Sequence, residues 1–553
     1  MAQMRAAPQS IALVWLIPFL LLLGASLGLV LLTLAVESAT LNLGEAQVPW
    51  LSRLDTRAAL ESISNAAEVV AAVLGIAITV VAIIVELAAN RYTHRITELF
   101  VREPVNLIVM GFFVLTAGYC VWMSATLGGR EAQGGAVPYG AVSIALTMVT
   151  LSLLLLLPYF NFVFAFLQPV AVVDRIRRHA FKVARRAARG YRHGLRADMV
   201  TSLEQLEDVA MNAMGNKDRG ISLAAVDALY EFVRDYAGIR EGLDSRWFEI
   251  DRSLARDPSF IAMAPHARED VARQKLWVEM KVLRQYHTIY VEALNDMRSA
   301  AYLVSLNTHQ IGTESLQWKH YSIYDLCVRI FNSYLRAAIN SHDVRTAYYT
   351  LHHYRGLAEE AVQAGEIDRA VDVASYFRYY GQLAYAERLP FLLEAVAYDV
   401  ALICECAFEI QSPARERLLE IFLTVDKESE SPEQESSLRG VRRAQVQLAT
   451  YFLSRGDHEH ARHVFEDMEH ERPERLASIR EELLGEDNPD YWEVTDRGVN
   501  FGYLPPDRRA QVPEFFAWFG NRIPPRREIH DPDAGVALPR RSVGSKAAGG
   551  SGS

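Results

Sequence analysis

Apolar residues divide the chain into a membrane part and a polar helical part. Four segments are long enough to cross a bilayer and carry almost no charge; they are residues 11–36, 66–90, 105–127 and 139–167. Between residues 170 and about 519 the apolar positions recur with helical periodicity, and no stretch alternates as a strand does. The pattern therefore predicts an all-α fold, in which a four-span transmembrane domain precedes a large cytoplasmic α-helical bundle or irregular α-solenoid.

The second apolar segment places its small and polar residues on one helix face. These residues, called the polar stripe below, are Glu68, Ala72, Gly75, Thr79, Ala82, Glu86 and Asn90. Their spacings of three and four residues match the helical repeat of about 3.6 residues. Glu68 and Glu86 are 18 residues apart, which is about 27 Å along a helix. One carboxylate is therefore expected near each surface of a bilayer core of roughly 30 Å.

Two interpretations of the polar stripe stay open. In an oligomer it would line a water-filled path with a carboxylate ring at either mouth, an arrangement that favours cations. Glu68 would form the outer ring, Thr79 the middle, and Glu86 with Asn90 the inner ring. Small residues also let membrane helices pack closely. A pore needs an oligomer or a hydrated internal cavity along the stripe, whereas a simple anchor should bury the stripe dry against neighbouring spans.

Positive charges set the orientation. With the N-terminus in the cytoplasm, thirteen Lys and Arg residues lie near the inner ends of the spans and three near the outer ends. The first apolar run of about 26 residues exceeds a signal-peptide core of roughly 7 to 15, so we interpret it as a retained span. The sequence predicts a multi-pass protein of the bacterial inner membrane with both termini in the cytoplasm.

A basic collar at residues 170–198 follows the fourth span. Its residues expected to face lipid are Arg175, Arg177, Arg178, Lys182, Arg185 and Arg186. Such a surface suits anionic lipid headgroups, although charge of this kind also serves simply to set topology. The formal net charge of the whole chain is −10, so the distal part is acidic. Nucleic acid is not an expected partner, because no other basic stretch is interleaved with aromatic residues.

The domain boundaries follow from these patterns. We expect a transmembrane domain at 1–169, the collar at 170–198, a cytoplasmic helical domain at 199–424, an acidic linker at 425–437, a second helical segment at 438–520, and a disordered tail with a terminal Gly/Ser linker at 521–553. The turns that begin at Gly365 and Gly456 resemble those of tetratricopeptide-type helix pairs, but they are 91 residues apart, so no regular 34-residue array is expected. Residues 268–306 carry a heptad seam that predicts one long helix.

Motifs for chemistry are missing. The chain has no phosphate loop, no nucleotide fingerprint and no nucleophile elbow. The nearest motif to a zinc site, His458-Glu459-His460, has Arg462 where a second ligand would be needed, and the four cysteines lack zinc-site spacing. We therefore expect no enzyme activity, no catalytic residue, no metal and no cofactor.

Part of the chain resembles a known family. Arg91-Tyr92-Thr93-His94-Arg95, Phe100-Val101-Arg102 and Gly111-Phe112-Phe113, together with residues 206–214 and 225–229, are similar to a widespread bacterial family of predicted membrane proteins known only as a domain of unknown function. His94 departs from the proline that the family tends to have there. The resemblance covers roughly residues 60–235 and implies four spans with a cytoplasmic helical domain, but no activity.

Two functions remain in view. The leading hypothesis is an oligomeric, cation-preferring ion channel, a homo-oligomer lined by the second span and gated or assembled through its cytoplasmic helices. The alternative is a membrane-anchored helical-repeat scaffold or signalling protein that binds a protein partner in the cytoplasm.

Overall fold

The fold is seen in a computed structural model, which describes residues 24–36, 56–91, 100, 103–133, 138–166, 168–192, 194–426, 432–490 and 497–523. Over these residues the secondary structure is helical, with one isolated bridge between Asp490 and Val499. The prediction of an all-α fold is confirmed. The described residues form two compact units, one containing α2, α4 and α5 and the other containing α8 to α22.

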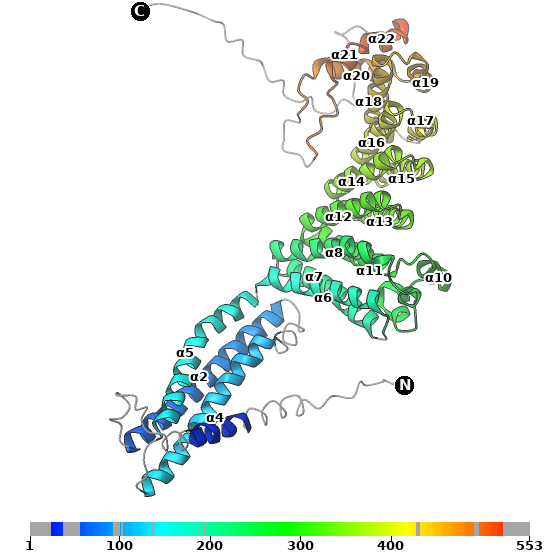
Figure 1. The fold of residues 1–553 in the computed structure, drawn as a ribbon. Coiled ribbons are helices and arrows are strands. Elements are labelled where there is room, and N and C mark those ends of the chain that lie inside the picture. The colour runs from blue at the N-terminus through cyan, green and yellow to red at the C-terminus, as the bar shows by residue number, and fades with distance from the viewer. Residues whose placement is uncertain are drawn as a thin grey trace, which may run out of the picture. The chain divides into compact units, whose positions relative to one another are not determined.

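Three helices of the first unit are long and apolar enough to cross a membrane. They are α2 (Thr56–Arg91), α4 (Pro104–Gln133) and α5 (Tyr139–Phe166), drawn in blue and cyan in Figure 1. Of the first predicted span, the helix Gly24–Val36 is described, and the residues before it lie outside the described ranges. Helix α2 begins ten residues before the predicted span.

The first unit is held together by apolar packing and by hydroxyl contacts between helices. Helix α2 packs on α4, and both contact α5. Ser64 of α2 hydrogen-bonds Ser124 of α4 at 2.8 Å. Ser152 of α5 donates to Thr116 of α4 at 3.1 Å, and both of these side chains are fully buried. Such interhelical bonds contribute about 0.6 kcal/mol each in a bilayer, so they define register more than they supply stability.

The second unit contains a regular run of helices that the sequence analysis missed. Five successive helices have 20 residues each and start 23 residues apart: α12 (Arg298–Gln317), α13 (Tyr321–Asn340), α14 (Val344–Gln363), α15 (Ile367–Ala386) and α16 (Pro390–Glu409). Two helices therefore make a 46-residue repeat. The expectation of an irregular solenoid is wrong for this part of the chain.

The helices of the second unit stack in two rows (Figure 1). The first row is α8, α12, α14, α16 and α18, in which each helix packs on the next; the second row contains α11, α13, α15 and α17. The remaining bounds are α6 (Pro169–Arg189), α7 (Leu195–Gly215), α8 (Arg219–Arg240), η1 (Ser245–Phe248), η2 (Leu254–Arg256), α9 (Pro258–Ile261), α10 (Pro265–Arg273), α11 (Trp277–Asp296), α17 (Arg415–Leu423), α18 (Pro432–Ser454), α19 (His458–Met468), α20 (Pro473–Gly485), α21 (Pro506–Arg509), α22 (Val512–Ala517) and η3 (Gly520–Arg522).

The turns explain why the repeat is hidden in the sequence. Each helix of the run ends at a residue with positive φ, and these residues recur every 23 positions: Lys319, His342, Gly365, Arg388 and Gln411. The residue after each one donates its N–H to the carbonyl five positions earlier, as Glu366 does to Ala361 at 2.9 Å. This is the Schellman ending of a helix, which glycine normally supplies. Here four of the five positions carry a side chain, so only Gly365 was recognisable.

Three other expectations are corrected. The predicted helix over 268–306 is divided among α10, α11 and α12, with breaks at Lys275, whose φ is +59°, and at Met297. The predicted acidic linker, 425–437, contains Asp426, which instead pairs with Arg442 at 2.8 Å in a largely buried position. The predicted second helical segment is interrupted after α20, because the chain between Gly485 and Pro506 forms no helix over its described residues. Beyond residue 523 the predicted tail lies outside the described ranges.

Candidate functional site

The polar stripe lies on the outside of the first unit. Its described side chains, those of Glu68, Ala72, Gly75, Thr79, Ala82 and Glu86, are all exposed, and the side chain of Asn90 lies outside the described ones. The opposite face of α2 is buried against the other helices through Ile63, Val70, Ala77, Val81 and Val85. Among the residues that the structure describes, therefore, the stripe neither packs dry against neighbouring spans nor lines an internal cavity.

The hydroxyl group of the exposed stripe has a hydrogen-bond acceptor on its own helix. The Thr79 hydroxyl donates to the carbonyl of Gly75 on the same helix at 2.8 Å, and a Cβ added at Gly75 would meet no atom within 4 Å. The two carboxylates are different, because an ionised group facing hydrocarbon costs roughly 2.5 to 3.5 kcal/mol at the bilayer centre and less near its surfaces. Glu86 lies near the end of the candidate span Arg57–Ala88, where that cost is smaller, whereas Glu68 lies eleven residues inside it.

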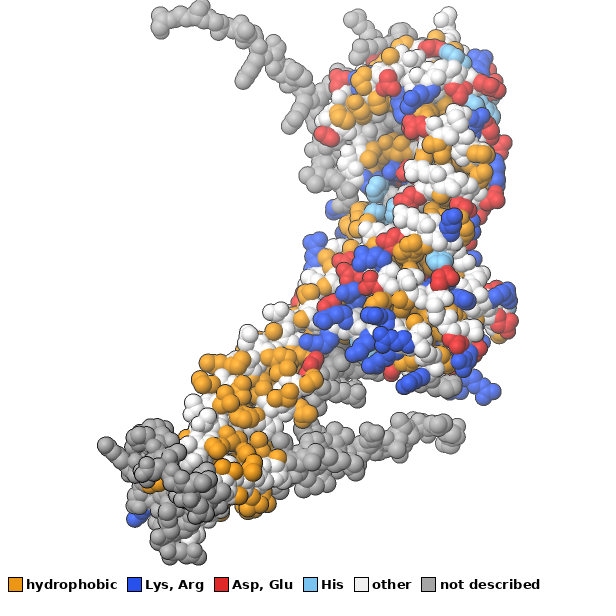
Figure 2. Space-filling view, in the orientation of Figure 1, with side chains coloured by type: hydrophobic (Ala, Val, Ile, Leu, Met, Phe, Trp, Pro, Cys, Tyr) orange, Lys and Arg blue, Asp and Glu red, His pale blue; other side chains and the backbone are white. Residues whose placement is uncertain are grey.

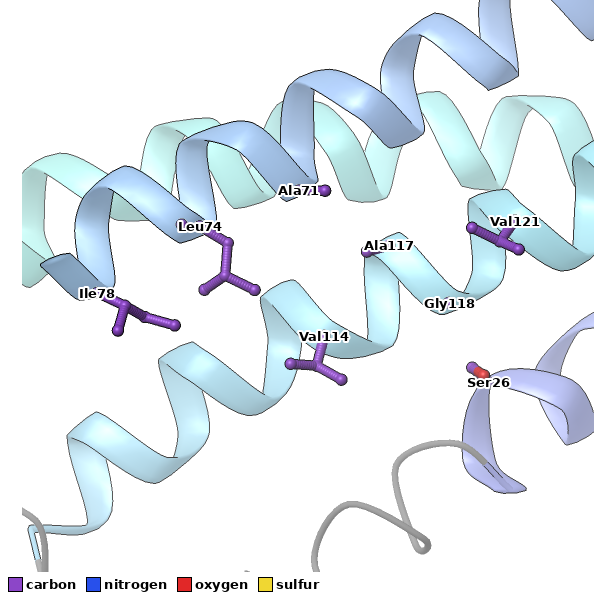
Figure 3. A pocket seen from close by; sticks show the side chains of 9 residues that line it. Ser26, Ala71, Leu74, Ile78, Val114, Ala117, Gly118 and Val121 are labelled. Atoms are coloured by element: carbon purple, nitrogen blue, oxygen red, sulfur yellow. The ribbon is translucent and has the colours of Figure 1, made fainter.

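An apolar crevice of about 420 Å³ borders the stripe at Gly75. Figure 3 shows its walls, which are formed by α2, α4 and the helix Gly24–Val36. The lining residues are Ser26, Ala71, Leu74, Gly75, Ile78, Val114, Ala117, Gly118 and Val121. The helix Gly24–Val36 approaches α4 closely, because a Cβ at Gly118 would come within 2.9 Å of the Ser26 hydroxyl. The lining suits hydrocarbon rather than a polar ligand.

The basic collar lies mainly on α6, whose two faces differ sharply. Ile176, Ala180 and Val183 are buried on one face, while the other carries Lys182 and Arg185 into solvent. Figure 2 shows the blue side chains that gather around α6 and α7. The predicted members divide into two groups: Arg178, Lys182, Arg185 and Arg186 are exposed, and Arg175 and Arg177 are partly buried.

Arg175 serves the interior of the first unit rather than its surface. Its guanidinium lies 3.6 Å from the centroid of the Phe166 ring and 3.7 Å from the Glu103 carboxylate. Burial lowers the pKa of this guanidinium below its usual value. Arg177 and Arg178 both pair with Asp174, at 2.9 and 2.8 Å. The surface free to meet headgroups is therefore centred on Lys182, Arg185 and Arg186.

A second candidate site lies on the first row of the second unit and was not expected from the sequence. Asp399 of α16 has a fully buried side chain that receives two guanidinium groups. Arg355 of α14 reaches it at 3.0 Å, and Arg497 reaches both of its oxygens, one of them at 3.1 Å. Arg497 also lies 4.3 Å from the centroid of the Tyr348 ring. A buried carboxylate is tolerated only with such partners.

Arg497 begins a non-helical stretch, segment 497–503, that crosses three helices of the first row. Four residues later, the centroid of the Phe501 ring lies 4.6 Å from the centroid of the Tyr398 ring. The ring centroids of Tyr348 and Phe391 lie 6.2 and 6.1 Å from it. The Gln447 amide of α18 then donates to the carbonyl of Phe501 at 2.8 Å. We call the surface formed by these side chains of α14, α16 and α18 the groove. The Gly and Pro residues after position 497 signal a helix break, and they could have revealed this segment.

Three histidines extend the groove toward α12. His309 of α12 contacts the His353 carbonyl through Nδ1 at 2.7 Å and the Glu360 carboxylate through Nε2 at 3.2 Å. Burial lowers the pKa of His352 to about 4 and that of His353 to about 3, and nearby positive charge adds to both shifts. Burial opposes the charge on His309 too, but the hydrogen bond and the charge of Glu360 outweigh it and raise the His309 pKa. Among the described residues, no group of three or more His, Cys, Asp and Glu side chains is placed to hold a metal ion.

Residues 12–234 match a family described as "Predicted membrane protein (DUF2254)". The match confirms the resemblance found in the sequence and extends it to the first predicted span. It ends within α8, so the groove and the whole regular run lie beyond it. No curated protein and no solved structure matches the chain.

Proposed function

We propose that this predicted membrane protein is a membrane-anchored helical-repeat scaffold that binds a protein partner in the cytoplasm through the first row of its second unit. One observation carries the proposal: segment 497–503 already lies across α14, α16 and α18 and is held there by defined side chains. A surface that accepts one polypeptide segment in this way has the chemistry to accept another.

The regular run supports the same function. Stacked helix pairs create long continuous surfaces that bind extended partners, because each repeat adds a strip to the same face. The apolar helices of the first unit would keep that surface at the membrane, with both termini in the cytoplasm of a bacterial cell. The exposed face of α6 would add contacts with anionic headgroups through Lys182, Arg185 and Arg186, each contributing about 1 kcal/mol near an anionic surface.

Site-specific photocrosslinking in intact cells tests the scaffold. A photoreactive residue replaces Tyr349, which borders the groove on α14, or Tyr376 as the matched control on α15 of the second row. We expect one protein to be crosslinked from position 349 and not from position 376, and we expect Asp399→Asn to weaken that product. Identical products at both positions, or none from the groove, would contradict the proposal.

A second candidate function is an oligomeric, cation-preferring channel lined by α2. The specific observation that favours it is the position of the described side chains of the polar stripe on the outside of the first unit, where a neighbouring copy would cover them. Glu68 would form the outer ring, Thr79 the middle one, and Glu86 the inner one, joined by Asn90.

Currents across planar bilayers test the channel. Glu68→Gln and Glu86→Gln should each weaken cation selectivity, because each removes a ring of charge. Glu459→Gln is the matched control, since it removes an exposed carboxylate that lies on α19 of the second unit and not on α2. A folded protein that carries no current across voltage, tension and Ca²⁺ would remove the channel from consideration.

A further inference from the structure

We infer that segment 497–503 is an internal ligand of the groove, and that the partner bound there is an extended peptide presenting an arginine and, four residues later, an aromatic ring. The inference rests on the scaffold proposed above and specifies the chemistry of its partner. Segment 497–503 crosses α14, α16 and α18 in turn, and each helix contributes a different kind of contact.

The first contact selects a guanidinium. Without Arg497, the buried Asp399 would keep Arg355 as its partner, but Arg355 also pairs with Glu359 at 3.0 Å. Two carboxylates would then share one cation, which leaves the site negatively charged. A guanidinium fits better than an ammonium, because it can bridge both oxygens of Asp399 while stacking on the ring of Tyr348.

The second contact selects an aromatic ring. Phe501 lies among Tyr348, Phe391 and Tyr398. Phe391 is 41% exposed even with the segment in place, so removal of Phe501 would leave an open aromatic patch. Such patches favour being covered by another apolar group. An incoming ring four residues from an arginine would cover it in the same way.

The third contact is a hydrogen bond to the main chain of the segment, next to a position with little space for a side chain. Gln447 donates to the carbonyl of Phe501, a bond that any peptide could accept in that position. A Cβ at the next residue, Gly502, would lie 3.1 Å from Glu482 and 3.3 Å from Asn500. The preferred ligand therefore carries a small residue directly after the aromatic one.

The groove does not depend on the segment for its own shape. Helices α14 and α16 pack directly on each other, as do α16 and α18. The chain after the segment is attached separately, because Arg508 of α21 makes a bidentate pair with Glu405 at 2.8 and 2.7 Å. Release of residues 497–503 would therefore leave the helices stacked. A tethered ligand acts at an effective concentration that reaches millimolar values, so an outside peptide competes poorly until the segment is released.

A binding experiment on the full chain in detergent tests this. The probe is a fluorescent peptide of residues 497–506, Arg-Gly-Val-Asn-Phe-Gly-Tyr-Leu-Pro-Pro, followed by anisotropy. The chain with Arg497→Ala and Phe501→Ala should bind it at least tenfold more tightly than the native chain. Adding Asp399→Asn should weaken that binding at least tenfold, and a peptide with alanine at both anchor positions should not bind. Failure of the intact peptide to bind the folded double variant overturns the inference.

Hydrogen exchange on the native chain gives a test that needs no variant. If the segment is a releasable ligand, its amides should exchange at least tenfold faster than those of α16, because release is a local opening. Equal protection of the segment and α16 would mean that they open only together, which overturns the inference.

The two proposals can fail separately. A partner crosslinked from position 349 that the free peptide does not displace would leave the scaffold standing and overturn the internal-ligand inference. A native chain that dimerises in detergent, and loses the dimer on Arg497→Ala with Phe501→Ala, would place the segment of a second copy in the groove and also overturn it. Peptide binding without any crosslinked partner would support the internal ligand and contradict the scaffold.

Discussion

Lys319 and Gly365 occupy equivalent turns exactly two helices apart, with φ angles of +59° and +75°. In both, the preceding helix ends with the same pair of hydrogen bonds: Lys319 donates to Leu316 and His320 to Ser315, while Gly365 donates to Val362 and Glu366 to Ala361. The backbone geometry is thus the same with and without a side chain. Only the side chain at position 319 makes the left-handed conformation costly, by about 1 kcal/mol.

Lys319→Gly should therefore stabilise the protein by about 0.5 to 1 kcal/mol, since glycine adopts positive φ without a Cβ clash but is also freer in the unfolded chain. The reciprocal change, Gly365→Ala, should destabilise it by about 1 kcal/mol. Thermal unfolding of the full chain in detergent measures both. Shifts of the same sign for the two variants would contradict the equivalence of the turns.

Gly356→Ala should destabilise the protein by about 1 to 3 kcal/mol, the usual cost of overpacking. An added Cβ would lie 2.2 Å from Cε1 of the His309 ring, which is itself held by Glu360 and the His353 carbonyl. Gly238→Ala in α8 is the matched control, because its Cβ would meet no atom within 4 Å. That control should be stabilised by about 0.5 to 1 kcal/mol. Equal effects would show that helix propensity, not the His309 contact, decides the outcome.

Stability should fall as the pH decreases from 7 to 5. The folded state lowers the pKa of His352 to about 4 and that of His353 to about 3, so the unfolded chain, with its ordinary His pKa near 6.5, binds more protons in this range. His309 has the opposite sign, because its raised pKa adds stability at low pH that is lost as the pH rises. His352→Asn should reduce the loss between pH 7 and 5 by about 1 kcal/mol. Denaturant unfolding at the two pH values would show no such difference if His352 titrates normally.

Removal of charge from α6 should reduce the anionic lipid that the protein retains. The triple variant Lys182→Gln, Arg185→Gln, Arg186→Gln removes the three exposed cations at the centre of the proposed headgroup-binding surface. It should lower the amount of phosphatidylglycerol that the protein retains severalfold, as measured by native mass spectrometry. The control carries the same loss of charge at Arg417, Arg455 and Arg462 in the second unit. Equal lipid loss in both variants would assign the effect to net charge alone.

Several features could be read from the sequence because they are local. The apolar runs that became α2, α4 and α5, the amphipathic pattern of α6, and the all-helical class follow from composition and from the helical period. The family match over residues 12–234 also agrees with residues recognised in the sequence.

The repeat could have been found only in part. Its clearest signal is glycine at the helix end, but Lys319, His342, Arg388 and Gln411 take the same conformation through hydrogen bonding and packing of the surrounding helices. The αL penalty of a single residue is small compared with the packing of two 20-residue helices, so tertiary structure overrides the local preference. A search for equal helix spacing, rather than for glycine, would have been the better signal.

The sequence by itself determined which segments form helices long and apolar enough to cross a membrane and which form polar helices, because length, charge and periodicity are properties of one segment at a time. Only the tertiary structure decided which face of α2 points outward, since hydrocarbon and a helix packed with valine are equally apolar environments and a pattern does not distinguish them. Only the tertiary structure brought Arg497 to Asp399 across 98 positions of the chain. A pair of that separation depends on how the helices stack, and no local pattern encodes it.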